Sequence, residues 1–121
     1  MPGTDFEPIF NELKTLLEPY REQMVLKADL PELFYLEAPN QGNFNKEVFF
    51  GSVKINKNYV SYHLMPVYIF PDLLNSLSPE LKKRMQGKSC FNFSKLSQVD
   101  LDGLAEITRQ GFERYRQAGL V

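Results

Sequence analysis

One segment of the chain places the only imidazole among tyrosines and a hydroxyl group. It runs Tyr59-Val60-Ser61-Tyr62-His63-Leu64-Met65-Pro66-Val67-Tyr68. In a β-strand, alternate side chains point to opposite faces, and here one predicted face carries Tyr59, Ser61, His63 and Met65. A histidine on such a face could bind a metal ion or transfer a proton near neutral pH. The alternative is a strand histidine that hydrogen-bonds to the backbone or to water.

A second segment combines a charge, a hydroxyl and the only thiol. It runs Gly87-Lys88-Ser89-Cys90-Phe91-Asn92-Phe93. The phosphate-binding loop of nucleotide-binding proteins needs another glycine where Lys82 stands, so we exclude that motif. Lys88 and Ser89 could still hold a small anion, because a lysine charge beside a hydroxyl favours one. Cys90 could form a nucleophilic pair with His63, and the alternative is a thiol that only packs in the core.

Aromatic side chains in both segments could form the wall of a small-ligand pocket. The five candidates for this wall are Tyr59, Tyr62, Tyr68, Phe91 and Phe93. An aromatic core is the alternative, and we prefer it for Tyr62 and Phe91. The predicted ligand-binding set is Tyr59, Ser61, His63, Met65, Tyr68, Lys88, Ser89 and Asn92.

Hydrophobic spacing indicates which elements position these residues. Helical periodicity predicts a first helix from Phe6 to a break near Pro19, and a last helix from Asp100 to Gly119, in which Gly111 allows close backbone approach. Ser78-Pro79-Glu80 begins a shorter helix that should end at Gly87. Strands are predicted over residues 33–38, 47–55, 59–65 and 90–93.

Local hairpin connections between these strands predict an α+β fold. We expect an antiparallel sheet of about four or five strands with the long N- and C-terminal helices packed on one face. Residues 1–121 should form a single domain, because this is close to the commonest domain length and no linker is visible.

Bulk composition narrows the choice of partners. With 14 Lys and Arg against 15 Asp and Glu, the net charge of −1 argues against a nucleic-acid partner. We interpret the basic run Lys82-Lys83-Arg84, with Lys88, as a solvated helix face. A single cysteine, and an N-terminus without a secretory signal, predict a cytoplasmic protein. No apolar run is long enough to cross a bilayer, so we expect no membrane partner, and a monomer or homodimer.

Three stretches together resemble a known bacterial family. They are Phe49-Phe50-Gly51, residues 59–68, and Ser78-Pro79-Glu80-Leu81-Lys82-Lys83-Arg84-Met85-Gln86-Gly87-Lys88-Ser89-Cys90-Phe91-Asn92-Phe93. The chain is similar here to the YdhG-like family, a domain of unknown function. The resemblance implies an α+β fold related to frataxin-like proteins, one family member being regarded as a frataxin-type intracellular iron chaperone. It implies no catalytic residues.

Three classes of function follow from these observations. The first is a binding module that holds a small ligand or a protein partner near residues 59–68 and 87–93. The second is a frataxin-type iron chaperone, although the acidic residues of the terminal helices are interspersed with cations and form no dense ridge. The third is an enzyme of unknown reaction, but no paired carboxylates, triad or metal-ligand spacing stands out. No cofactor is predicted, and iron comes from the resemblance alone.

Overall fold

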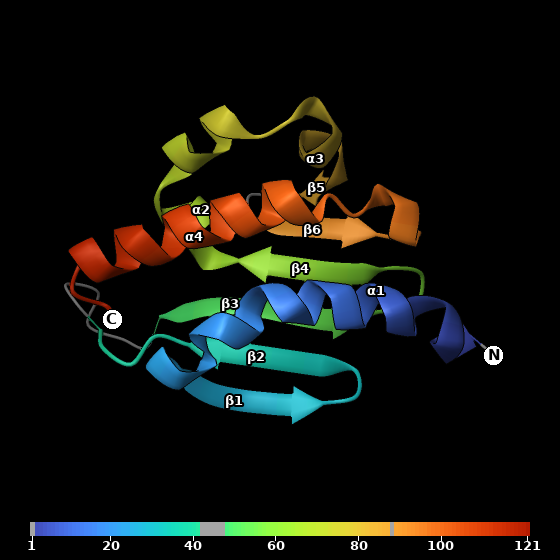
Figure 1. The fold of residues 1–121 in the computed structure, drawn as a ribbon, viewed down its shortest axis with the longest axis horizontal. Helices are drawn as coiled ribbons and strands as arrows, with labels where there is room; N and C mark the ends of the chain where they lie inside the picture. The colour runs from blue at the N-terminus through green and yellow to red at the C-terminus, as the bar shows by residue number, and fades with distance from the viewer. Residues whose placement is uncertain (1, 42–47, 88) are drawn as a thin grey trace.

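Two long helices lie side by side on one face of a six-stranded antiparallel β-sheet (Figure 1). The computed structural model describes residues 2–41, 48–87 and 89–121. The strands are β1 (Val25–Leu30), β2 (Leu33–Glu37), β3 (Phe49–Ile55), β4 (Val60–Leu64), β5 (Met85–Gln86) and β6 (Cys90–Phe93), in the sheet order β1-β2-β3-β4-β6-β5. The α-helices are α1 (Pro2–Leu17), α2 (Met65–Ile69), α3 (Pro79–Arg84) and α4 (Leu101–Gln117), and the 3₁₀ helices are η1 (Glu18–Gln23), η2 (Pro71–Ser76) and η3 (Leu96–Gln98). The predicted α+β class is confirmed, with six strands rather than four or five.

Strict alternation in the central strands sets the two faces of the sheet. Val60, Tyr62 and Leu64 of β4 are each fully buried beneath the helices. The residues between them, Ser61 and His63, are only half-buried and point to the other face. The core between sheet and helices is therefore built from every second strand residue, and the intervening residues are left for other contacts.

A β-bulge in β3 interrupts this alternation. Leu36 pairs with Gly51 and the next residue of β2, Glu37, pairs with Phe49, so Phe50 is the extra residue. The Phe50 ring is buried and packs edge-on against Tyr115 of α4, 5.6 Å between centroids. Phe49 consequently turns to the opposite face of the sheet, the face that carries His63.

Helix α4 packs on the sheet through its buried stripe and approaches α2 closely at one glycine. The Asp100 side chain accepts from the Gly103 N–H and so caps its first turn. A Cβ added at Gly111 would lie 2.7 Å from Cβ of Pro66, which confirms the predicted close approach. Near the end of the helix, the Tyr115 hydroxyl donates to the Phe49 carbonyl at 2.8 Å, beside the bulge. This bond joins the last helix to the start of β3.

A buried hydrogen-bond chain joins β4 to the middle of α4. The Thr108 hydroxyl donates to the Leu104 carbonyl at 2.7 Å, which uses its only proton. The Tyr62 hydroxyl, 2.6 Å from the Thr108 oxygen, must therefore be the donor of that bond. Burial strongly raises the pKa of Tyr62, so the phenol stays protonated.

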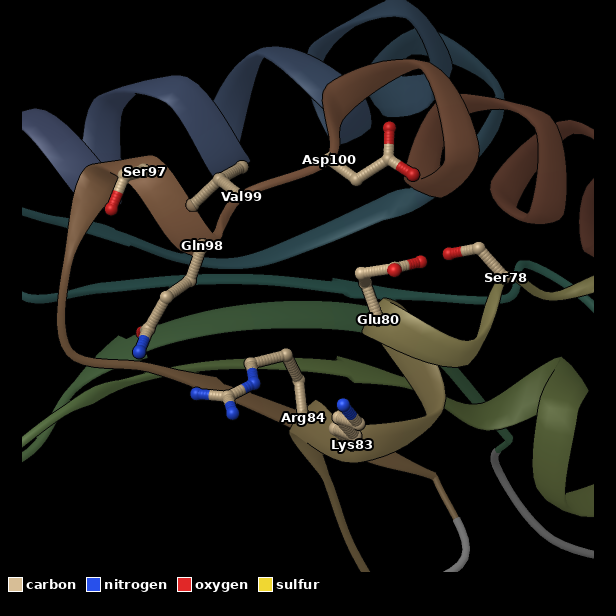
Figure 2. A pocket seen from close by; sticks show the side chains of 8 residues that line it. All are labelled: Ser78, Glu80, Lys83, Arg84, Ser97, Gln98, Val99 and Asp100. Carbon is tan, nitrogen blue, oxygen red and sulfur yellow. The ribbon is translucent and has the colours of Figure 1, made fainter.

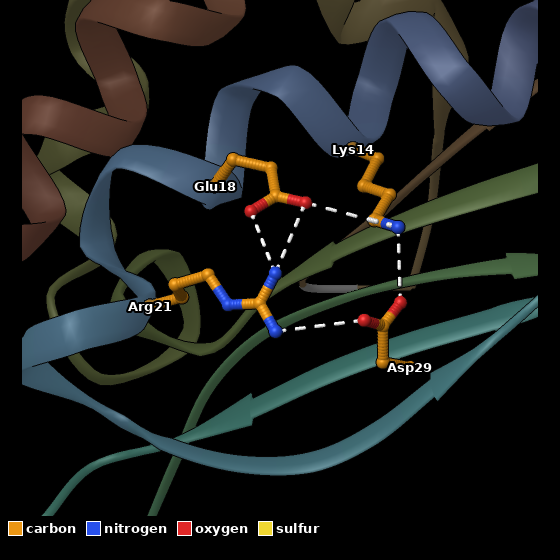
Figure 3. A network of polar contacts seen from close by, with 4 residues as sticks. All are labelled: Lys14, Glu18, Arg21 and Asp29. Atoms are coloured by element: carbon orange, nitrogen blue, oxygen red, sulfur yellow. Dashed lines mark hydrogen bonds and ion pairs between the residues drawn. The ribbon is translucent and has the colours of Figure 1, made fainter.

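Four charged residues connect α1, η1 and the edge strand β1 (Figure 3). Lys14 Nζ lies 2.9 Å from Asp29 Oδ1, and Arg21 bridges the Asp29 and Glu18 carboxylates at 3.5 and 3.1 Å. Both cations also lie over the Phe34 ring, 5.1 and 5.8 Å from its centroid. The network therefore joins α1 and η1 to the edge strand β1, and its two cations cover the buried Phe34 ring. The Lys14 hydrogen bond holds the pKa of Asp29 below its usual range.

The structure adds one strand that was not predicted and moves several predicted element boundaries. Strand β1 was not predicted, because its edge position leaves most of it exposed and a bulge between Leu26 and Ala28 breaks its alternation. The helix expected to reach Gly87 ends at Arg84, and Met85–Gln86 form strand β5. Met65 is the first residue of α2 rather than the end of the strand. Gly87 has a φ of 77°, as a left-handed residue, but in the β5–β6 turn.

No helix in the described ranges has both the length and the apolar character needed to span a bilayer.

We predict that Thr108→Val destabilises the fold more than Tyr62→Phe. The valine leaves the buried Tyr62 hydroxyl without its acceptor, at a cost of about 2 kcal/mol in the free energy of unfolding. The phenylalanine leaves Thr108 still bonded to Leu104 and should cost about 1 kcal/mol. The double variant should lose less than the sum. Denaturant unfolding measures all three, and a reversed order or strict additivity would contradict the assigned direction of the bond.

We also predict that Asp29→Asn lowers the thermal midpoint at low salt. The change removes a carboxylate shared by two cations, and because the network is partly exposed, the loss should shrink at about 1 M NaCl. The matched control is Glu32→Gln, which removes the same charge at the β1–β2 turn. Equal losses for the two variants, or no salt dependence, would show that the network does not stabilise this edge.

Candidate functional site

The predicted site residues lie mostly on the sheet face opposite α1 and α4. The strand register pairs Ser61 with Asn92 and His63 with Cys90. The Leu64 N–H donates to the Ser89 carbonyl, which extends this ladder by one bond. Residues from the two segments singled out in the sequence are therefore direct neighbours. Lys88 lies outside the described residues.

His63 is enclosed by an aromatic ring and a buried hydroxyl. Its Nε2 lies 2.5 Å from the Ser89 hydroxyl oxygen, and Ser89 is 7% exposed. The Phe49 ring packs edge-on against the imidazole at 4.5 Å between centroids, with Tyr35 beyond it at 5.5 Å. Burial lowers the pKa of His63, so the neutral imidazole is favoured at pH 7. This environment agrees with a hydrogen-bonded strand histidine.

The neighbouring thiol is poorly suited to nucleophilic chemistry. Cys90 pairs with His63 across the strands, but partial burial raises the pKa of the thiol. A thiolate is the reactive form, and this shift disfavours it at neutral pH. In the described ranges, no group of three or more His, Cys, Asp or Glu side chains is placed to hold a metal ion. The iron expected from the resemblance finds no ligand set there.

A second polar chain orients Asn92. The Asn56 amide donates to the Ser61 hydroxyl at 2.9 Å, and that hydroxyl donates to Asn92 Oδ1 at 2.9 Å. The Asn92 oxygen is therefore occupied as an acceptor. Its Nδ2 donates no hydrogen bond to any described residue, so two N–H donors remain available at the surface.

Asn92 and Tyr59 line a hollow of about 500 Å³ that we call the Tyr59 hollow. Its wall is formed by Asn58, Tyr59, Lys83, Arg84, Gln86, Asn92 and Ser94. These residues come from the β3–β4 turn, the end of α3, β5 and the end of β6. Tyr59 is 38% exposed, which is enough to offer a ring face to a ligand. Of the seven predicted binding residues that the structure describes, the hollow brings together two, Tyr59 and Asn92.

A second hollow lies on the other side of Lys83 and Arg84 (Figure 2). We call it the Asp100 hollow; it measures about 360 Å³ and is lined by Ser78, Glu80, Lys83, Arg84, Ser97, Gln98, Val99 and Asp100. In Figure 2 the Glu80 side chain points toward Ser78, while Arg84 extends the other way, toward Gln98. The lining of this hollow thus includes two cations and two carboxylates, Glu80 and Asp100, and no ion pair joins them. The Tyr59 hollow has the same two cations and no carboxylate from the residues that the structure describes.

Tyr68 and Met65 do not reach the Tyr59 hollow. Tyr68 is 55% exposed and lines a third, largely apolar hollow of about 550 Å³, together with Val67, Pro71, Leu74, Met85 and Gly87. Met65 is half-buried against the core. Helix α2 begins at Met65, with Pro66 in its first turn, and carries Tyr68 away from the strand face. The predicted set is thus divided among the His63 environment, the Tyr59 hollow and the Tyr68 hollow.

Sequence reasoning missed the two cations of the Tyr59 hollow. Lys83 and Arg84 were interpreted as part of a solvated helix face, because a basic run on a short helix usually is one. Their approach to Tyr59 depends on β5 pairing with β6 and β6 pairing with β4, which no local pattern predicts. The sequence feature that could have indicated this approach is the short interval between Arg84 and the turn at Gly87.

We predict that His63 makes stability fall on mild acidification. Because the pKa of His63 is lowered by burial, the unfolded chain binds a proton near pH 6.5 before the folded chain does. Stability is therefore complete above about pH 6.5 and declines as the pH falls toward the folded pKa. Chemical unfolding between pH 8 and 5, roughly the range in which an imidazole titrates, should show a smaller decline in His63→Gln. Parallel pH profiles would contradict this assignment.

Comparison with known proteins returned no matching family model, no similar curated protein and no similar solved structure. The similarity to the YdhG-like family accordingly remains a prediction, carried by the motifs quoted above. What the fold and the site can do chemically must be argued from this chain's own residues.

Proposed function

We propose that this chain is a small-ligand binding module and that the Tyr59 hollow is its site. One observation supports this above the others. The Asn56–Ser61–Asn92 chain satisfies the Asn92 oxygen and leaves its N–H donors free at the wall of a hollow that also offers an aromatic ring. Concave sites that combine an aromatic surface with a few oriented polar groups are typical of small-molecule binding.

The proposal modifies the expectation from the sequence. It keeps Tyr59, Ser61 and Asn92, with Ser61 acting through Asn92, and adds Lys83 and Arg84. His63 and Ser89 stabilise the neighbouring strands instead of meeting the ligand. A cytoplasmic location and membership of the YdhG-like family belong to the same proposal, because each agrees with the chain's composition and motifs. An iron chaperone is a weaker alternative, supported by the resemblance alone.

A screen of small fragments by thermal shift tests the proposed function. A fragment present at about 100 times its Kd should stabilise the fold by about 2.7 kcal/mol, a shift of several degrees for a chain of this size. Tyr59→Leu should remove the shift for most fragments that bind, since it deletes the ring but keeps an apolar side chain. Tyr68→Leu is the matched control, because Tyr68 is also an exposed tyrosine but lines a different hollow. Equal sensitivity of the two variants, or no stabilising fragment, would count against the site.

A further inference from the structure

Lys83 and Arg84 are cations that form no ion pair with any carboxylate in the described part of the chain. Each of the ion pairs there uses a cation from Lys14, Arg21, Lys27, Arg109, Arg114 or Arg116. Glu80 stands three residues before Lys83 and four before Arg84, the spacings at which helical ion pairs normally form. Glu80 forms no such pair with either cation, and Figure 2 shows the Glu80 and Arg84 side chains pointing apart. The two cations are therefore available to a ligand.

The donors of the Tyr59 hollow match the chemistry of a phosphate group. The Lys83 ammonium, the Arg84 guanidinium and the Asn92 Nδ2 group all donate hydrogen bonds, and none of these nitrogen groups accepts one. Among the described residues, the lining includes no carboxylate that would repel an anion. A guanidinium and an ammonium complement each other here, because the first makes paired bonds to a phosphate and the second supplies a compact charge.

Tyr59 adds a second requirement for the ligand. Its partly exposed ring belongs to the same wall as the cations, so a ligand that fills the hollow meets both. A flat unsaturated ring gains most from such a surface, because stacking needs a π-face on each partner. A volume of about 500 Å³ lies within the range that holds molecules of drug or cofactor size.

We infer that the Tyr59 hollow binds small molecules in which a phosphate is joined to a flat ring, as in a nucleoside monophosphate. This inference rests on the proposed function and narrows its ligand class. Lys83, Arg84 and the Asn92 amide hold the phosphate, and Tyr59 stacks on the ring. The chain's net charge of −1 does not favour a long nucleic acid, whose affinity would come from many phosphate contacts.

Calorimetric titration of the full chain with three probes tests the inference. The probes are adenosine monophosphate, adenosine and inorganic phosphate, so that the ring and the phosphate are measured together and apart. We expect the monophosphate to bind at least about tenfold more tightly than either part, since charged hydrogen bonds and stacking each contribute about a factor of ten. A uridine monophosphate titration should give similar affinity, because stacking tolerates different bases.

Charge variants on α3 provide the matched comparison. Lys83→Gln and Arg84→Gln should each lower the affinity for the monophosphate about tenfold and leave the affinity for adenosine unchanged. Lys82→Gln removes the same charge from the same helix, but Lys82 does not line the hollow, so binding should be retained. Equal losses for Lys82→Gln and Lys83→Gln would overturn the inference, because they would indicate only a diffuse positive field.

The Asn92→Asp variant separates an effect on fold stability from an effect on ligand binding. The carboxylate still accepts from the Ser61 hydroxyl, so the thermal midpoint should stay close to that of the parent chain. The new negative charge should lower the affinity for the monophosphate by at least about tenfold. Asn75→Asp places the same charge on an exposed residue of η2 and should have little effect. Unchanged binding in Asn92→Asp would overturn the assigned role of the amide.

The outcomes distinguish this inference from the proposed function. If neither monophosphate saturates at millimolar concentration while neutral fragments still bind in a Tyr59-dependent way, the ligand class is wrong and the binding module stands. If fragments also fail to bind, both fail. If an oligonucleotide binds far more tightly than the monophosphate, with a steep dependence on salt, the hollow is part of a nucleic-acid surface and the inference is overturned.

Discussion

The structure depends on one geometric constraint: side chains alternate across a strand, and the long helices lie on a single face of the sheet. In β4 this forces Tyr62 and Leu64 into the core and turns Ser61 and His63 away from it. Burying each large apolar side chain contributes about 2 kcal/mol, more than one exposed polar contact. The positions of the polar residues are thus consequences of how the core packs, and a change of register by one residue would exchange them with the core.

The bulge at Phe50 shows how the two faces remain coupled. It lets Phe50 pack on α4 while the preceding residue, Phe49, meets His63 on the other face. The same Phe49 carbonyl accepts the Tyr115 hydroxyl bond. Phe49 is part of the environment that buries His63 and lowers its pKa. The bulge and the Tyr115 hydrogen bond, which involve the core face, therefore help to hold that environment in place. This explains why His63 is better described as part of the scaffold than as a ligand-binding group.

Periodic patterns predicted the elements that bury a regular stripe, and failed where burial is irregular. The alternation around Tyr62 and the long helical stripes predicted β4, α1 and α4 correctly. Strand β1 was not predicted because Val25, Leu26 and Leu30 are exposed at the sheet edge and a bulge disturbs the alternation of apolar and polar residues. Strand β5 has two residues, too few for any pattern. The grouping of Tyr59 with Arg84 depends on pairing between distant strands, so local sequence could not show it.

The net charge of −1 does not show that some cations of the chain form ion pairs while others do not. Most ion pairs tie neighbouring elements or helix turns, whereas α3 ends in cations whose nearest helical acid, Glu80, turns to the Asp100 hollow. At physiological ionic strength, charges more than about 8 Å apart at the surface are largely screened, so only acids close to Lys83 and Arg84 can offset them, and none of the described acids forms an ion pair with either. Strand β5 follows these cations directly and pairs with β6 after the turn at Gly87, which sets the cations beside Asn92 and Tyr59. The local positive field of the Tyr59 hollow is in this way a product of chain topology rather than of composition.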